Sequence, residues 1–274
     1  MRDGSVPRLA LVLGAGGFRG RASLGVLRRL RAESIPIDSI VGVSAGALIA
    51  GYHAGVGWDA DECIAQVSRL GSRMLLAYGV SHSRIPLLAR LAWPSAEPVR
   101  RWVELLDAAS FDRLHHGLRA IGVLAYDLNS KKVVLFATGQ ENDGVTISQA
   151  VRASAAVPFL LGPVRIRGRE HEYRLLDGGV ADAMPVSVAF APPFSADFVL
   201  AVDITRDPRP GLRRLMPGLR EDRSERLIVV RPRVASGGTI FTRRGSVRWQ
   251  VRAGEECVTP EVIAQLRGWL RVPA

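Results

Sequence analysis

Two glycine-containing turns, each placed directly after a short apolar run, constrain the fold of this chain more than any other feature. Residues 11–27 read LVLGAGGFRGRASLGVL, which predicts a buried strand, a glycine-rich turn and the start of a helix. Residues 42–46 read GVSAG and lie between a second apolar run and a second apolar helix, so Ser44 stands at the apex of a strand-to-helix elbow. Strands and helices that alternate with short joints favour a parallel sheet.

The remaining hydrophobic patterns predict further elements around this sheet. The expected strands are 9–13, 40–43, 119–124, 132–136, 173–176, 198–204 and 227–231, and the expected helices are 21–33, 45–53, 59–70, 146–156 and 260–270. Residues 85–107 are expected to be helical in pieces, because Pro94 and Pro98 interrupt the pattern. Segments 206–226 and 236–252 are rich in Arg, Pro or Gly and predict long loops, interpreted either as plain surface connections or as basic flaps near a lipid-facing cleft.

Length and charge bound the classes of protein and partner. A chain of 274 residues with 47% hydrophobic residues is long enough for one large α/β domain with a full core. The net charge is +11, and all but two of the 37 basic residues are arginine. This excess indicates either a basic solvated surface or contact with phosphate groups of an anionic membrane. No zinc-finger or RNA-binding signature is present, so we expect no nucleic-acid partner.

The cysteines and the apolar segments indicate a compartment. Cys63 and Cys257 lie outside any CxxC pattern or metal-like cluster, which predicts a reducing cytosol, no disulfide framework and no metal site. The first residues, MRDGSVPR, carry no apolar segment, and the most apolar stretch, 40–54, is short and broken by glycines. We therefore expect a cytoplasmic protein whose contact with a membrane, if it has one, is peripheral and on the inner face.

Ser44 is the candidate nucleophile. A serine on a sharp turn between a strand and a helix projects its hydroxyl above the sheet, and the flanking Gly42 and Gly46 permit the tight backbone. The competing interpretation is an ordinary strand-to-helix turn in which Ser44 only caps the helix.

The glycine turn at residues 14–20 has three interpretations. It lacks the Gly-Lys of a phosphate-binding loop, and its glycine spacing departs from the dinucleotide fingerprint, although Asp38 stands near the position of the acidic residue that fingerprint requires. The third interpretation is an oxyanion hole in which Gly16 and Gly17 direct their N–H groups at a developing negative charge. Arg19 would add positive charge there or hold the loop.

Asp177 ends an apolar strand and begins a DGG turn, where a carboxylate is either a solvated turn residue or part of a site. A serine nucleophile needs a base, and none of the histidines stands in a recognisable triad context. In their absence a partly buried carboxylate is the candidate base. The histidines are His53, His82, His115, His116 and His171.

Three motifs together give the chain a family resemblance. The glycine turn, the GxSxG elbow and the late DGG occur in the order and at the spacing typical of patatin-like phospholipases, and the flanking SAAVP at 154–158 and VADAMPV at 180–186 match as well. The resemblance covers residues 8–190. Ala15 replaces one glycine of the family's turn, and Asp182 stands where the family often has asparagine.

The resemblance implies a three-layer α/β/α sandwich with a mainly parallel central sheet, built as one domain over residues 1–274, with residues 191–274 completing the sheet. It also implies a Ser44–Asp177 dyad, an oxyanion hole at Gly16, Gly17 and Arg19, no cofactor, and a lipid ester substrate. The alternatives are a catalytically weak lipid-binding regulatory protein on the same fold and, from the glycine turn, a nucleotide-binding oxidoreductase. The lipid, the ester position and the oligomeric state are not predicted.

Overall fold

The computed structural model describes residues 6–69, 74, 77–78, 86–157, 162–204, 225–234 and 246–272. The predicted loop 206–226 lies almost entirely outside them. The strands are β1 (Leu9–Leu13), β2 (Ser39–Val43), β3 (Ala120–Asp127), β4 (Lys132–Ala137), β5 (Val164–Arg167), β6 (Glu172–Asp177), β7 (Phe198–Val202) and β8 (Leu227–Val230). The main helices are α1 (Arg21–Ala32), α2 (Ala45–Ala50), α3 (Ala60–Arg69), α5 (Pro86–Asp107), α6 (Ile147–Ser154), α7 (Val186–Phe190), α8 (Ser246–Glu256) and α9 (Pro260–Leu270).

The eight strands of the described ranges belong to one sheet. Its main path runs β5-β6-β3-β2-β1-β7-β8, and β4 pairs with β3 outside this path. The run from β3 through β2, β1 and β7 to β8 is parallel, whereas β4, β5 and β6 pair antiparallel to their neighbours. All five residues of β1 are buried, as expected for a central parallel strand covered on both faces.

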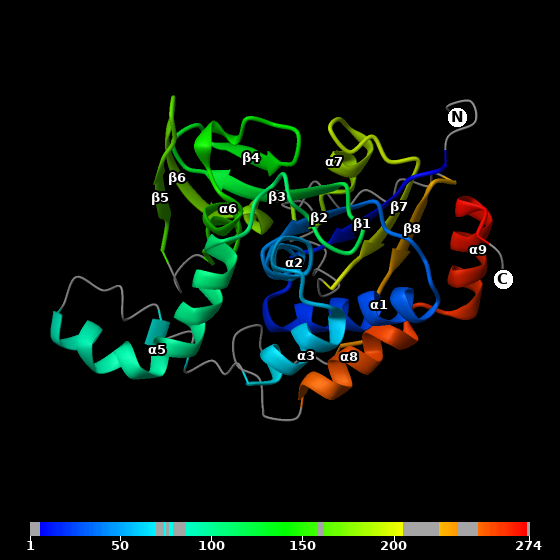
Figure 1. Cartoon of the computed structure of the whole chain (residues 1–274), viewed down its shortest axis with the longest axis horizontal. Coiled ribbons are helices and arrows are strands. Elements are labelled where there is room, and N and C mark those ends of the chain that lie inside the picture. The colour runs from blue at the N-terminus through cyan, green and yellow to red at the C-terminus, as the bar shows by residue number, and fades with distance from the viewer. Residues whose placement is uncertain are drawn as a thin grey trace, which may run out of the picture.

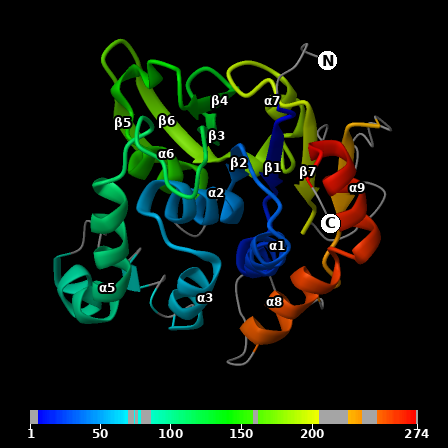
Figure 2. The same cartoon turned by 45° about the vertical axis from the view of Figure 1, so that its right-hand side comes forward.

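The alternation of side chains along β1 separates two cores, one on each face of the sheet. Leu9, Leu11 and Leu13 pack into the larger core with residues of α1, α2, α6 and α8, and Ala10 and Val12 pack into the smaller core beneath α7. Figures 1 and 2 show the helices on both sides of the sheet. The predicted three-layer α/β/α fold is therefore confirmed.

The edge of β3 carries two strands in succession. Val43, the last residue of β2, pairs with Leu124, and the next residue of β3, Ala125, pairs with Asp177, the last residue of β6. The opposite edge of β3 is occupied by β4 over residues 122–127, so β2 and β6 must share one edge. They approach along it from opposite directions and end head to head, which brings the carboxyl ends of both strands to one place.

Two predictions about helices were wrong. Residues 86–107 form one helix, α5, rather than several pieces; its interior prolines, Pro94 and Pro98, are exposed, and the helix bends sharply along its length in Figure 1, as interior prolines cause. The expected loop 236–252 ends in α8, which begins at Ser246. The sequence patterns also missed the short elements β5 and α7.

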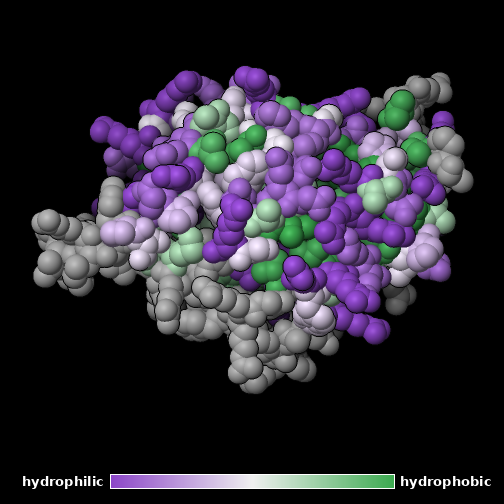
Figure 3. Space-filling view, turned by 60° about the horizontal axis from the view of Figure 1, so that its bottom comes forward, coloured by the Kyte–Doolittle hydropathy of each residue, from purple (hydrophilic) through white to green (hydrophobic). Residues whose placement is uncertain are grey.

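Helix α8 crosses α1 at two glycines. A Cβ placed on Gly254 would overlap the carbonyl oxygen of Ala22, and one placed on Gly25 would overlap the carbonyl oxygen of Val251. The two backbones touch because neither glycine has a side chain. On the underside of the molecule as Figure 1 draws it, polar residues predominate and apolar ones stand in small separate areas (Figure 3).

We expect Gly254→Ala to lower the free energy of unfolding by about 1–3 kcal/mol, because the added methyl group meets backbone that cannot rotate away. Gly268→Ala in α9 is the matched control, since a Cβ there meets nothing within 4 Å and the change should stabilise the helix by up to about 1 kcal/mol. Urea unfolding of both variants tests this, and equal stabilities would contradict the crossing.

Candidate active site

Ser44 occupies a sharp elbow between β2 and α2. Its backbone has φ 57° and ψ −120°, and a positive φ is uncommon for a residue with a side chain. The glycines around it are required by contact: a Cβ on Gly46 would overlap the carbonyl oxygen of Leu13 in β1, and one on Gly42 would lie 2.5 Å from the carbonyl oxygen of Gly46. The GVSAG sequence therefore folds into a turn pressed against the neighbouring strand.

The side chains of Ser44 and Asp177 are in direct contact. The Ser44 hydroxyl donates a hydrogen bond of 2.5 Å to Oδ2 of Asp177, across a sequence separation of 133 residues. Each residue is only 4% exposed. The structure thus brings together the two side chains that the predicted dyad needs, at the point where β2 and β6 end head to head.

The environment of Asp177 raises the basicity of its carboxylate. Burial raises the pKa of Asp177 above its ordinary value, and hydrogen bonds from the Ser44 hydroxyl and the Gly179 amide oppose that rise. The Gly179 amide donates to Oδ1 at 2.8 Å, which leaves Oδ2 for Ser44. The carboxylate is therefore oriented by its own DGG turn. Asp182 helps to close this turn, since its amide donates to the Gly178 carbonyl and its Oδ1 accepts the Met184 amide.

The glycine turn lies against both halves of the pair. A Cβ on Gly20 would lie 2.5 Å from the Cβ of Ala45, the residue after Ser44, and a Cβ on Gly179 would lie 2.8 Å from the Cβ of Ala15. The Ala15 amide donates a hydrogen bond of 2.9 Å to the Ala183 carbonyl oxygen. Its methyl group packs against the DGG turn.

The two amides predicted to form an oxyanion hole are open. In the part of the chain that the structure describes, the N–H groups of Gly16 and Gly17 donate to no other protein group. Gly17 has φ 55°, which glycine adopts without strain. Arg19 is half-buried on the same turn, and its amide donates to the Gly16 carbonyl. Their participation in catalysis stays a prediction.

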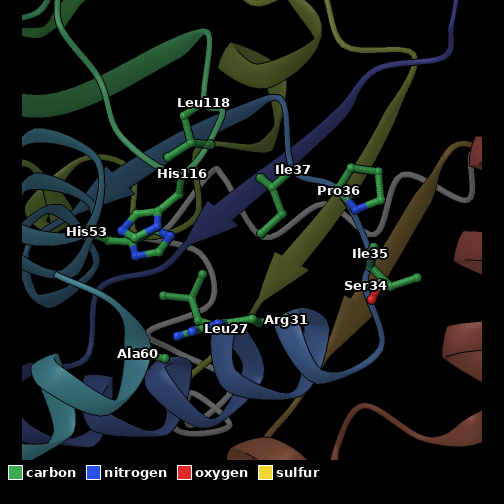
Figure 4. A pocket seen from close by; sticks show the side chains of 10 residues that line it. All are labelled: Leu27, Arg31, Ser34, Ile35, Pro36, Ile37, His53, Ala60, His116 and Leu118. Carbon is green, nitrogen blue, oxygen red and sulfur yellow. The ribbon is translucent and has the colours of Figure 1, made fainter. Parts of the chain in front are cut away.

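No hydrogen bond joins Ser44 to any of the described histidines, and His82 lies outside the described residues. His53 donates a hydrogen bond of 2.8 Å from Nδ1 to the Trp58 carbonyl oxygen, and its ring stacks on His116 at 4.2 Å between centroids. Burial lowers the pKa of His53 to about 4. Both rings line a cavity of about 360 Å³ (Figure 4) beside the segments that precede β2 and β3, at the end of the strands opposite to Ser44. This cavity is not the site of the serine.

No group of three or more His, Cys, Asp or Glu side chains suited to a metal ion occurs within the described ranges. Over those same ranges, none of the helices has the length and apolar character needed to cross a bilayer.

Comparison with known proteins identifies the family. The model of the patatin-like phospholipase family matches residues 11–190. The chain belongs to this family. It is 32% identical over 213 residues to the NTE family protein Rv1063c of Mycobacterium tuberculosis, covering 74% of this chain and 51% of that protein. It is 28% identical over 184 residues to the lysophospholipase NTE1 of Kluyveromyces lactis, covering 65% of this chain and 11% of that protein.

The fold of this chain is similar to those of several solved structures. VipD from Legionella pneumophila aligns with a TM-score of 0.52 and 14% identity, over 97% of this chain and 66% of that one. Human GIVD cytosolic phospholipase A2, in complex with methyl gamma-linolenyl fluorophosphonate, aligns with a TM-score of 0.54 and 12% identity, over 97% and 59% of the two chains. The patatin-like chain described here spans about half the length of the first curated relatives it matches.

The raised pKa of Asp177 predicts a pH-dependent difference in stability. Because the native pKa lies above the unfolded one, ionisation costs native stability, so the wild type loses stability as the pH rises through the native pKa. Asp177→Asn has no such loss. Its melting temperature relative to wild type should therefore rise as the pH increases from about 4 and level off above the native pKa. The exposed Asp112→Asn is the control, and a pH-independent difference for Asp177→Asn would contradict the burial argument.

Proposed function

We propose that this protein is a serine lipid acyl hydrolase that cleaves carboxylic esters through Ser44 and Asp177. The observation that carries the proposal is the buried 2.5 Å hydrogen bond from the Ser44 hydroxyl to a carboxylate whose basicity burial raises. A serine hydroxyl becomes a competent nucleophile only beside a base that takes its proton. Membership of the patatin-like phospholipase family supports an ester of a lipid as the substrate.

In the first half of the reaction, Ser44 Oγ bonds to the ester carbonyl carbon and its proton passes to Asp177 Oδ2. The carbonyl oxygen becomes an oxyanion, for which the open amides of Gly16 and Gly17 are the candidate donors. The amino end of α1, which follows this turn directly, adds favourable electrostatic potential. Collapse breaks the ester C–O bond, and the leaving alcohol takes the proton from Asp177.

In the second half, water replaces the alcohol. Asp177 accepts a proton from a water molecule as the oxygen of that water attacks the carbonyl carbon of the acyl group on Ser44. The second tetrahedral intermediate collapses, the fatty acid leaves, and Ser44 recovers its proton. Every step uses one nucleophile, one base and the backbone amides, so the reaction requires no cofactor.

Exposed apolar side chains beside the dyad support a lipid substrate. Leu48 lies one helical turn after Ser44 and is 38% exposed, and Val180 lies three residues after Asp177 and is 46% exposed. Large apolar side chains left in water next to a candidate nucleophile fit a substrate with an acyl chain. We propose that these two residues contact the acyl part of the substrate.

A fluorophosphonate probe tests the nucleophile and the base. The wild type should be labelled and should hydrolyse an ester panel, whereas Ser44→Ala should show neither. Asp177→Asn should remain folded and lose hydrolysis by roughly 10²–10⁴-fold, the contribution typical of a general base. Ser148→Ala is the matched control, because this serine is fully buried and lacks a hydrogen-bond partner among the described residues. Labelling of Ser44→Ala at the wild-type level would overturn the assignment, and binding to lipid vesicles without turnover of any ester would favour the regulatory alternative.

Replacing Leu48 and Val180 by Ser should separate lipid from small-molecule substrates. We expect the double variant to hydrolyse long-chain lipid esters in vesicles roughly 100-fold more slowly, since two apolar side chains at about 1.5 kcal/mol each contribute about 3 kcal/mol and about 1.4 kcal/mol is a factor of ten in rate. It should hydrolyse a short acetate ester at the wild-type rate. Val133→Ser is the control, because Val133 is similarly exposed, at 41%, but lies on β4. Equal losses on both substrates would place the two residues outside acyl recognition.

A further inference from the structure

We propose that Ser154 is a positioning residue for the dyad and that the end of α6 acts as a clamp on both of its members. The inference rests on the proposed function, because it assigns the residue that holds the side chains of Ser44 and Asp177 in their relative positions. The clamp consists of residues 154–156.

The first contact of the clamp is with the nucleophile. The Ser44 amide donates a hydrogen bond of 2.9 Å to the hydroxyl oxygen of Ser154, which is fully buried. Ser44 has a positive φ, which is strained for a residue with a side chain and persists only when its surroundings hold it. The bond to Ser154 satisfies the amide in this strained conformation. It also occupies the amide, so the Ser44 N–H is not a free oxyanion donor.

The second contact is with the base. The carbonyl oxygen of Ala156 accepts a hydrogen bond of 3.0 Å from the Asp177 amide. Ser154 and Ala156 stand two residues apart, so one short segment accepts hydrogen bonds from the backbone amides of both Ser44 and Asp177. The distance between the two side chains then depends on a segment that belongs to neither strand.

The segment is well placed to hold this geometry because α6 is capped at its start and buried along its length. At its start, Thr146 and Gln149 form a reciprocal capping box, in which each side chain accepts from the other's backbone amide. Along its length, Ile147, Ala150 and Val151 are fully buried. Helix α6 contacts β3 and β6 as well as α2, so the clamp moves with the strands that carry the site.

Loss of the Ser154 oxygen should disturb the dyad in a defined way. The Ser44 amide would be left buried without an acceptor, which favours relaxation of the elbow away from its strained φ. Such a shift moves the Ser44 hydroxyl off Asp177. A displacement of about 1 Å of a reacting group can cost roughly 100-fold in rate. Because the Ser44 bond lowers the pKa of Asp177, its loss should also raise that pKa further.

The test compares Ser154→Ala and Ser154→Cys with Ser148→Ala, which removes a fully buried hydroxyl from the same helix. Cysteine is somewhat larger than serine and so leaves no cavity, but its sulfur is a weak acceptor. We expect both Ser154 variants to show a roughly 100-fold lower kcat with little change in KM, slower labelling by the fluorophosphonate, and an acidic limb of the kcat/KM profile displaced to higher pH. Ser148→Ala should match the wild type.

The outcomes separate this proposal from the proposed function. A wild type without labelling or turnover contradicts the hydrolase itself. An active wild type together with a Ser154→Cys protein of normal kcat and pH profile overturns the clamp. Filling the space of the Ser154 side chain would then be enough for activity, without a strong acceptor for the Ser44 amide. If Ser154→Ala fails to fold, the Cys variant decides the question, since it leaves no cavity.

Discussion

The candidate site depends on how one edge of β3 is divided. Strand β2 pairs with the first part of that edge and β6 with the rest, so Val43 and Asp177 stand against consecutive residues of β3. Because β2 runs parallel to β3 and β6 antiparallel, both strands finish at the same point. The register of these two pairings places the hydroxyl and the carboxylate together, and a slip of one residue in either strand would turn its side chains to the opposite face of the sheet.

The site combines groups that are costly to bury. Asp177 loses solvation, Ser44 holds a positive φ, and the amides of Gly16 and Gly17 stay open among the described groups of the chain. Each of these features reduces stability in the absence of a substrate, and under the proposed function each favours the reaction in its presence. The surrounding sheet, with its buried β1 and two separate cores, provides the stability that allows them.

The sequence predicted the parts of this structure that depend on local patterns. The apolar run of β1 and the period of α1 identify their elements, and the turn chemistry around Ser44 identifies the elbow. The meeting of Asp177 with Ser44 was implied by the family resemblance alone, because antiparallel pairing of β6 with β3 leaves no local signal. The role of Ser154 was missed for a similar reason: its partner is an amide 110 residues away. Its one signal is a polar residue at the end of a buried helical face. The interior prolines of α5 misled the prediction because exposed positions tolerate a bend.

The position of β1 has a consequence for synthesis on the ribosome. One side of β1 pairs with β2 nearby, but the other side waits for β7, and Arg8 beside it bonds to Asp197 across a separation of 189 residues. At a translation rate of about 5–20 residues per second, the second edge of the central strand is exposed for roughly 10–40 s before its partner emerges. During this period the exposed edge of an apolar strand in the nascent chain can pair with a strand of another protein. We therefore expect the topology to make expression dependent on chaperones.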